Sequence, residues 1–298
     1  MRVVEGHTEP DAQDFLRLAG HPLRWRLLRE LACSDRRVYE LTDLLGEPQN
    51  LVSYHLGKLR SGRLVSARRS SADRRDLYYT ANLPRFAGLL AETGRSLHPG
   101  LRLEAAEPGP SGDNLDAPVR RLLFLCTGNS ARSQMAEALA RTHSGGRVRA
   151  HSAGSRPKPL HPNAIRVMRE AGIDLASHRP KHLEVFAAES FDLVITLCDR
   201  VREICPEFPG HPGHIHWSIA DPAASGGSDE QTYPGFQQLA AELETRVGFL
   251  LAGLQRGAAA AGRTPLRGKS LLPWPSGRGV VRPYREVVQA DSRDYEER

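Results

Sequence analysis

The sequence feature that most constrains the fold is the stretch 122–133, which reads LLFLCTGNSARS. Four apolar residues lead into Cys126, small and polar residues follow, and Arg132 comes six positions later, where an amphipathic stretch begins. This order predicts a buried strand, a tight turn and a helix. A turn of this kind at a helix N-terminus brings backbone N–H groups together and binds anions. We therefore expect an anion-binding loop.

Cys126 is the expected nucleophile of this loop. The field of a helix N-terminus favours the thiolate form of a cysteine, so we expect Cys126 to be a thiolate near neutral pH. A buried structural cysteine would explain Cys126 alone. It would not explain why the strand, the helix and Arg132 occur together with it.

Composition limits the class of protein. A chain of 298 residues with 40% hydrophobic residues is expected to form about two globular domains. It contains no run of roughly 20 apolar residues, and its polar, acidic start is unlike a secretory signal. Four cysteines are too few for a disulfide-built scaffold. We expect a cytoplasmic protein without a membrane partner, whose thiols serve catalysis.

Positive charge is concentrated near the N-terminus. Residues 21–86 hold 13 Lys and Arg against 7 Asp and Glu, whereas residues 119–255 hold 15 against 14. This asymmetry is typical of a nucleic-acid-binding module joined to a nearly neutral enzyme.

The basic region has the pattern of a helix-turn-helix. Helical periods run from Asp14 and after Pro22, a short helix is predicted at 38–45, a turn at 46–48 and a longer helix at 49–60. Val52, Leu56 and Leu59 share the inward face of the longer helix. The outward residues, which we expect to contact DNA, are Gln49, Asn50, Ser53, Tyr54 and Lys58.

Two strands with an arginine-rich connection follow the helix-turn-helix. Segments 64–69 and 74–80 are predicted to form a β-wing, and a last helix at 83–97 is expected to form dimer contacts together with the first helix. The wing residues expected to lie along the phosphate backbone are Arg68, Arg69, Arg74 and Arg75.

Residues 14–97 resemble the winged-helix repressors of the ArsR type, and LVSYHLGKLRSGRLV at 51–65 carries most of that likeness. The resemblance implies binding to operator DNA as a homodimer through this N-terminal domain. It also implies release from DNA when a metal or metalloid binds thiols in the first helix of the motif. That helix, 38–44, contains no cysteine, and Cys33 is the only thiol of the domain. Sensing through the usual thiol site is therefore not expected.

A proline- and glycine-rich linker is predicted at 98–118, a second domain at 119–255 and a disordered tail at 256–298. Within the second domain apolar strands alternate with amphipathic helices, which predicts an α/β fold with a parallel sheet covered on both faces. The predicted strands are 121–125, 147–151, 191–197 and 214–217, and the predicted helices are 133–142, 160–172 and 233–254. Ligands of such sheets bind at the carboxyl ends of the strands, where both Cys126 and Cys198 are expected.

Further residues point to the same edge. Asp221, which precedes Pro222 on a loop, is a candidate general acid, although Asp-Pro is also an ordinary turn sequence. Cys198 and Cys205 are seven positions apart, so they meet only if the segment between them loops or unwinds. Two unrelated thiols are the alternative.

Residues 120–254 resemble the low-molecular-weight protein tyrosine phosphatase superfamily and, within it, the arsenate reductases. The likeness is carried by CTGNSARSQMAE at 126–137, SAG at 152–154, GID at 172–174, LCD at 197–199 and DPA at 221–223. Ala131 stands where many members have a second loop cysteine. Ala223 and Ala224 follow the Asp-Pro pair, where the phosphatases typically have aromatic residues.

The resemblance implies a redox relay. Arsenate would bind the loop and Arg132, Cys126 would attack arsenic, and Asp221 would protonate the departing oxygen. Cys198 and then Cys205 would carry the disulfide outward to reduced thioredoxin or a comparable thiol, and arsenite would leave. The loop residues that would hold the oxyanion are Thr127, Gly128, Asn129, Ser130, Ala131 and Ser133.

The family also has a potassium site near the loop, which Asn129, Glu137 and Ser152 match in part. Two alternatives to the fused regulator and reductase stay open. One is a phosphatase fused to a regulator, with Cys198 and Cys205 incidental. The other is a regulator that uses an inactive phosphatase-like domain as an oxyanion sensor.

Overall fold

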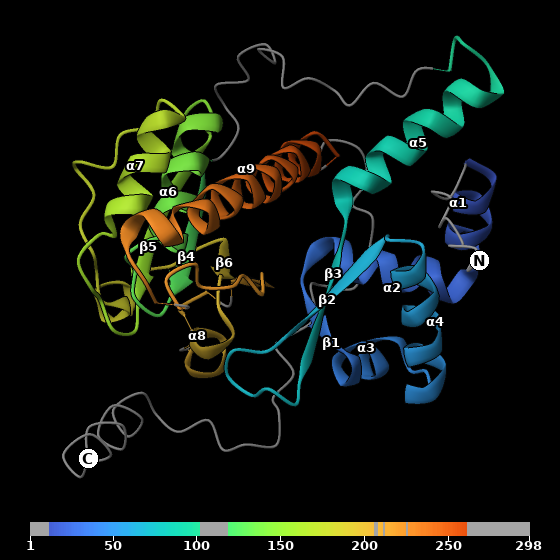
Figure 1. Ribbon diagram of the computed structural model, residues 1–298, viewed down its shortest axis with the longest axis horizontal. Coiled ribbons are helices and arrows are strands. Elements are labelled where there is room, and N and C mark those ends of the chain that lie inside the picture. The colour runs from blue at the N-terminus through green and yellow to red at the C-terminus, as the bar shows by residue number, and fades with distance from the viewer. Residues whose placement is uncertain (1–11, 102–118, 206–207, 211, 225, 261–298) are drawn as a thin grey trace, which may run out of the picture. The chain divides into compact units, whose positions relative to one another are not determined.

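The computed structural model describes residues 12–101, 119–205, 208–210, 212–224 and 226–260 (Figure 1). They form two units, whose main bodies are residues 12–101 and 119–260. In the described part of the chain, no helix is long and apolar enough to cross a membrane.

The helices of the N-terminal unit begin where the sequence provides caps. α1 is Ala12–Ala19, α2 is Pro22–Cys33 and α5 is Leu83–Leu97. Proline in the first turn of α2 needs no N–H partner, and His21 Nδ1 accepts the N–H of Leu23 at 3.2 Å. Asn82 caps α5 in the same way by accepting the N–H of Arg85 at 3.2 Å.

The predicted helix-turn-helix is present. It consists of α3 (Val38–Leu45) and α4 (Gln49–Ser61), and the turn between them starts at Gly46, whose φ of 66° is in the left-handed region that favours glycine. Val52, Leu56 and Leu59 of α4 are each 0% exposed, as expected for the inward face. They join the leucines of α2 and α3 in one core.

The wing contains a strand that the sequence analysis missed. β2 (Val65–Arg69) and β3 (Leu77–Ala81) pair antiparallel, and β1 (Arg36–Arg37) adds to the other edge of β3. No strand was predicted at 36–37, because two arginines carry no strand signal. Arg37 is held by tertiary contacts instead. It forms an ion pair with Asp76 at 2.8 Å and stacks on the Tyr78 ring. The second wing strand starts at Leu77, so Arg74 and Arg75 lie in the connection.

The C-terminal unit is the expected α/β domain. Its four-stranded sheet has the order β5-β4-β6-β7, and β4 is parallel to both of its neighbours. The strands are β4 (Arg120–Cys126), β5 (Val148–Gly154), β6 (Leu193–Thr196) and β7 (Gly213–His216). In the register of β4 and β5, Cys126 is paired with Gly154. Leu122 to Cys126 are all buried, because β4 is a central strand.

Helices pack on this sheet and on one another. α6 (Arg132–His143) packs on β4 and β5, and α9 (Asp229–Ala260) packs on α6 and on α7 (Pro162–Glu170) (Figure 1). Residues 132–140 of α6 are all buried. The buried surface of α6 is therefore wider than the single apolar face of an amphipathic helix.

Several predicted limits differ from the structure. No helix was predicted between the strands at 191–197 and 214–217, but the short helix α8 (Asp199–Ile204) lies there. A 3-10 turn, η1, covers Leu183–Phe186. α9 begins four residues before the predicted start and continues through Ala260. Most of the predicted linker, 102–118, and the predicted tail from 261 onward lie outside the described residues.

Candidate functional site

The site is built around the connection between β4 and α6. Cys126 is the last residue of β4, and Arg132 is the first residue of α6. Residues 127–131 form the loop between them. Cys126 is only 2% exposed, so its thiol lies within the carboxyl edge of the sheet rather than on the surface. This is the position that the sequence predicted for the nucleophile.

Outward-facing carbonyl groups set the shape of the loop. Segment 155–161 donates three backbone N–H groups to it: Arg156 to the Thr127 oxygen at 2.8 Å, Lys158 to the Gly128 oxygen at 2.9 Å, and His161 to the Ser130 oxygen at 3.0 Å. In a trans peptide the N–H points opposite to the carbonyl of the same peptide group. The N–H groups of Gly128, Asn129 and Ala131 therefore face away from segment 155–161, as an anion-binding loop requires.

Two backbone features make this turn possible. Asn129 has a φ of 43°, in the left-handed region, which asparagine adopts more readily than most residues. Gly154 lies against the loop so closely that a Cβ atom would come within 2.6 Å of the Thr127 oxygen and 2.8 Å of the Asn129 nitrogen. Glycine is thus required at 154 for steric reasons.

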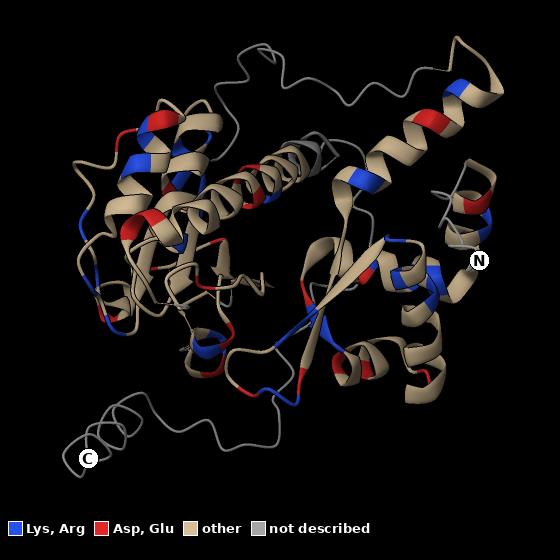
Figure 2. Ribbon diagram, viewed as in Figure 1, with Lys and Arg blue, Asp and Glu red and all other residues tan. Residues whose placement is uncertain are grey.

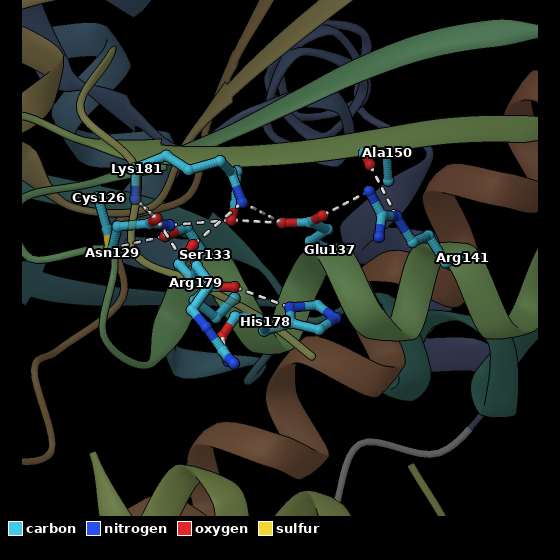
Figure 3. A network of polar contacts seen from close by, with 11 residues as sticks. Cys126, Asn129, Ser133, Glu137, Arg141, Ala150, His178, Arg179 and Lys181 are labelled. Carbon is cyan, nitrogen blue, oxygen red and sulfur yellow. Dashed lines mark hydrogen bonds and ion pairs between the residues drawn. The ribbon is translucent and has the colours of Figure 1, made fainter. Parts of the chain in front are cut away.

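The thiol of Cys126 has a hydrogen-bond partner at the start of α6. Cys126 Sγ lies 2.9 Å from Ser133 Oγ, and Asn129 Nδ2 donates to the same Ser133 oxygen at 2.9 Å (Figure 3). Because Ser133 already accepts from Asn129, its own hydroxyl proton is available to donate to sulfur. Such a donor stabilises a thiolate.

Arg132 connects the loop to the predicted general acid. Its buried side chain donates Nη1–H to the Ile219 carbonyl at 3.0 Å and forms an ion pair with Asp221 at 2.8 Å. Burial opposes the charge of Arg132, but the negative groups around it, Cys126 first, raise the pKa of the guanidinium. Asp221 is half-exposed, so its carboxyl group is open to solvent while it contacts Arg132.

The two further cysteines lie at the two ends of α8. Cys198 directly precedes the helix, and its Sγ lies 3.3 Å from the hydroxyl of Thr127 in the loop. Burial raises the pKa of the Cys198 thiol, while the charge of Arg132 opposes this shift. Cys205 directly follows the helix, is partly buried, and has a pKa raised by desolvation to about 12. The structure therefore places Cys198 at the loop and Cys205 at the opposite end of α8 from Cys198.

Some residues of the site were not predicted. Gln134 of α6 donates to Asn129 Oδ1 at 3.1 Å and accepts from His178 Nδ1 at 2.8 Å, and the backbone N–H of Lys181 donates to the same Asn129 oxygen at 2.7 Å. The contacts of His178 and Lys181 join positions 44 and 52 apart in the sequence. Spacing along the chain gives no signal for them.

The residues expected to contact DNA are on the surface of α4. Gln49, Asn50, Ser53, Tyr54 and Lys58 are all exposed, and the Lys58 ammonium lies 5.5 Å from the centre of the Tyr54 ring. In the wing, Arg69, Arg74 and Arg75 are exposed, whereas Arg68 is half-buried. Figure 2 shows the basic residues along the wing strands and their connection. Arg75 is paired with Asp73 at 2.8 Å.

Similarity to known proteins agrees with this geometry. Residues 121–260 match the family model for low molecular weight phosphotyrosine protein phosphatase, and residues 21–67 match the model for bacterial regulatory protein, arsR family. A protein named arsenate reductase from Bacillus licheniformis is 41% identical over 128 residues, which are 43% of this chain and 92% of that protein. The chain belongs to the low molecular weight phosphotyrosine phosphatase family.

Two further proteins show similar likeness to this chain. The arsenate reductase of Bacillus subtilis is 38% identical over 126 residues, covering 42% of this chain and 91% of that protein. The solved structure of a thioredoxin-dependent arsenate reductase from Corynebacterium glutamicum is 31% identical with a TM-score of 0.37, covering 47% of this chain and 64% of that chain. In the chain described here, the segment that matches the phosphatase family model, 121–260, ends at the last residue of α9.

Gly154→Ala is expected to weaken oxyanion binding, because the added Cβ collides with loop backbone rather than with a side chain that could rotate. We expect the affinity for inorganic phosphate or arsenate to fall by at least about tenfold, corresponding to about 1.4 kcal/mol. Isothermal titration calorimetry measures this. Gly248→Ala in α9, where a Cβ meets nothing within 4 Å, is the matched control. Unchanged affinity in Gly154→Ala would show that the loop does not need this close packing.

Cysteine reactivity should differ across the site. The pKa of Cys205 is raised from 9.0 to about 12, so this group stays a thiol, and its alkylation should rise only at strongly alkaline pH. Cys126, by contrast, is the expected nucleophile and lies between the Ser133 hydroxyl and the N-terminus of α6. Iodoacetamide should therefore label Cys126 before Cys205 near neutral pH. Peptide mass spectrometry after timed quenching measures the order, and preferential labelling of Cys205 would contradict it.

Proposed function

We propose that the chain is a bifunctional arsenic-resistance protein, in which an ArsR-type DNA-binding domain is joined to a reductase that converts arsenate to arsenite through a cysteine relay. One observation carries the choice of reduction. A second thiol, Cys198, lies at the anion loop, 3.3 Å from the Thr127 hydroxyl, and a third follows at the other end of α8. Hydrolysis of a phosphate ester needs neither thiol.

Arsenate binding would use the loop N–H groups together with Arg132. A guanidinium donates two parallel hydrogen bonds to a tetrahedral oxyanion. In the structure one edge of Arg132 contacts Asp221. A bound oxyanion would bring a second negative charge beside the Asp221 carboxylate. That arrangement favours a proton shared between them, which is the proton that the departing oxygen of arsenate needs.

The first chemical step would be attack of the Cys126 thiolate on arsenic. A sulfur–arsenic bond forms, and one oxygen leaves as water after it takes a proton from Asp221. Cys198, as thiolate, then attacks the sulfur of Cys126. The sulfur–arsenic bond breaks with its electron pair on arsenic, so As(V) becomes As(III) and leaves as arsenite. The two thiols are oxidised to a Cys126–Cys198 disulfide.

The next transfer requires a change in α8. Residues 198 and 205 are separated by the whole of α8, and a helical rise of 1.5 Å per residue places them about 10 Å apart. Cα atoms joined by a disulfide are usually about 4.4–6.8 Å apart. A Cys198–Cys205 disulfide is therefore possible only after α8 unwinds. This releases Cys126 as a thiolate and leaves a disulfide that a dithiol of the thioredoxin type can reduce.

A phosphotyrosine phosphatase activity is the second candidate. It is favoured by the family model that residues 121–260 match and by the loop, which suits phosphate as well as arsenate. The two functions differ in their use of Cys198 and Cys205. Hydrolysis of p-nitrophenyl phosphate without any need for these thiols would support the phosphatase.

For the N-terminal domain we propose binding to duplex DNA as a homodimer. Support comes from the exposed polar face of α4 and from apolar residues left exposed on α1 and α5, namely Leu16, Leu90 and Leu97. Both proposed activities need components, DNA and reduced dithiols, that occur together in the cytoplasm.

Cys205→Ser tests the relay. With arsenate, thioredoxin, thioredoxin reductase and NADPH, this variant should release about one arsenite per chain and then stop, because its disulfide stays between Cys126 and Cys198. NADPH consumption and arsenite release measure the result. Cys33→Ser replaces an exposed thiol of the other domain and should turn over normally. Full turnover in Cys205→Ser would rule out the relay in this form.

Arg74→Ala tests DNA binding by the wing. Loss of one phosphate contact should weaken binding to a mixed-sequence duplex and reduce the slope of log affinity against log salt by about 0.9. Fluorescence anisotropy across a salt series measures both. Arg17→Ala removes an exposed arginine of α1, outside α4 and the wing, and should leave the slope unchanged. The same slope in Arg74→Ala and the native chain would exclude this contact.

A further inference from the structure

A buried carboxylate lies behind the Cys126 loop. Glu137 of α6 is 2% exposed, and each of its oxygens is occupied (Figure 3). Oε1 pairs with the Arg141 guanidinium at 2.6 Å. Oε2 accepts from the Ser152 hydroxyl at 2.5 Å and faces the Lys181 ammonium at 3.5 Å. Arg141 is itself fixed, because its Nε donates to the Ala150 carbonyl at 2.9 Å. A buried carboxylate is therefore neutralised by two cations of the chain.

A chain of hydrogen bonds connects Glu137 to the nucleophile. Ser152 donates to Glu137 and accepts from Asn129 Nδ2 at 2.9 Å. The other proton of the Asn129 amide goes to Ser133, and Ser133 contacts the sulfur of Cys126. Every donor of the Asn129 amide group is used. The orientation of Asn129 therefore determines whether Ser133 can donate to the thiolate.

Lys181 contacts this chain at both ends. Its backbone N–H donates to Asn129 Oδ1 at 2.7 Å, and its ammonium lies between Glu137 and the Arg179 carbonyl, which is 3.3 Å from Nζ. A positive charge held by a carboxylate and a backbone carbonyl is the arrangement of a bound cation. Here the cation is covalently part of the chain.

The residues present do not fit the potassium ion that the resemblance implied. Asn129 Oδ1 already accepts two hydrogen bonds, from Lys181 and from Gln134. Ser152 accepts one hydrogen bond and donates another. Potassium would also become the third positive charge around the single carboxylate of Glu137. An oxygen-lined site without these two cations would be needed for a metal ion of this kind.

We propose that Lys181 is a positioning residue that supplies a built-in cation, so that the Cys126 loop keeps its anion-binding shape without potassium. It acts through Glu137 and Asn129, not on the oxyanion. The ammonium compensates the buried charge of Glu137, and the backbone N–H holds the Asn129 amide in the orientation that serves Ser133. The chain should therefore be indifferent to the choice between sodium and potassium.

The test compares potassium with sodium at equal ionic strength. Lys181→Met removes the cation but keeps the backbone N–H, Lys181→Arg keeps a cation, and Arg149→Ala removes an exposed cation of β5 outside this network. The first readout is the rate at which iodoacetamide alkylates Cys126, followed by peptide mass spectrometry. The second is arsenate turnover. Only the second rests on the proposed function, so a failure of the reductase proposal leaves the first readout intact.

In the native chain, Lys181→Arg and Arg149→Ala, both rates should be the same in KCl and NaCl. In Lys181→Met we expect both rates to be about tenfold lower in NaCl, the size typical when a residue that orients a functional group is removed. In KCl the rates should recover, because a potassium ion can enter beside Glu137. The proposal is wrong if potassium accelerates the native chain, or if Lys181→Met is indistinguishable from Arg149→Ala. It is also wrong if potassium restores nothing to a folded Lys181→Met, since Lys181 would then be structural only. Should Lys181→Met not fold, the comparison of the native chain in the two salts still decides.

Discussion

The site depends on the close contact between Gly154 and the backbone of the Cys126 loop. β4 and β5 are in register, so that Cys126 and Gly154 end their strands side by side. With no side chain at 154, the chain can continue directly along the loop and donate N–H groups of segment 155–161 to the loop carbonyls. Those bonds orient the loop N–H groups toward the anion side. The loop shape expected of an anion-binding site thus follows from sheet pairing and from the absence of a side chain at position 154.

A second constraint is that the buried polar groups behind the loop hydrogen-bond or form ion pairs with one another in a single network. A buried carboxylate is unfavourable unless it is paired and hydrogen-bonded, and Glu137 meets both conditions through Arg141, Ser152 and Lys181. Because Asn129 and Ser133 share hydrogen bonds with this network, the geometry at Cys126 is determined partly by charges outside the loop. Loop sequence alone does not determine how such a loop is supported.

Periodicity and caps made much of the fold predictable. α3 and α5 have the predicted limits, since Gly46 and Asn82 mark their ends in the sequence. β1 was not predictable, because Arg36 and Arg37 become a strand only through pairing with Tyr79 and Tyr78. In the site, strand ends located Cys126 and Cys198. Lys181 and Gln134 were missed because most of their contacts join distant positions. The potassium site that the resemblance implied stays a prediction, and the proposed role of Lys181 is an alternative to it.

α8 has a consequence for the partner of the relay. A six-residue helix is marginal by itself, because nucleation uses most of the stabilisation that so few hydrogen bonds provide. In a relay through its two flanking thiols, the oxidised chain lacks this helix and the reduced chain has it. The surface offered to a reductant then exists only while there is a disulfide to reduce. After reduction α8 forms again, and the surface that the reductant contacted is no longer present. Dissociation of the oxidised reductant is then coupled to the redox state of Cys198 and Cys205.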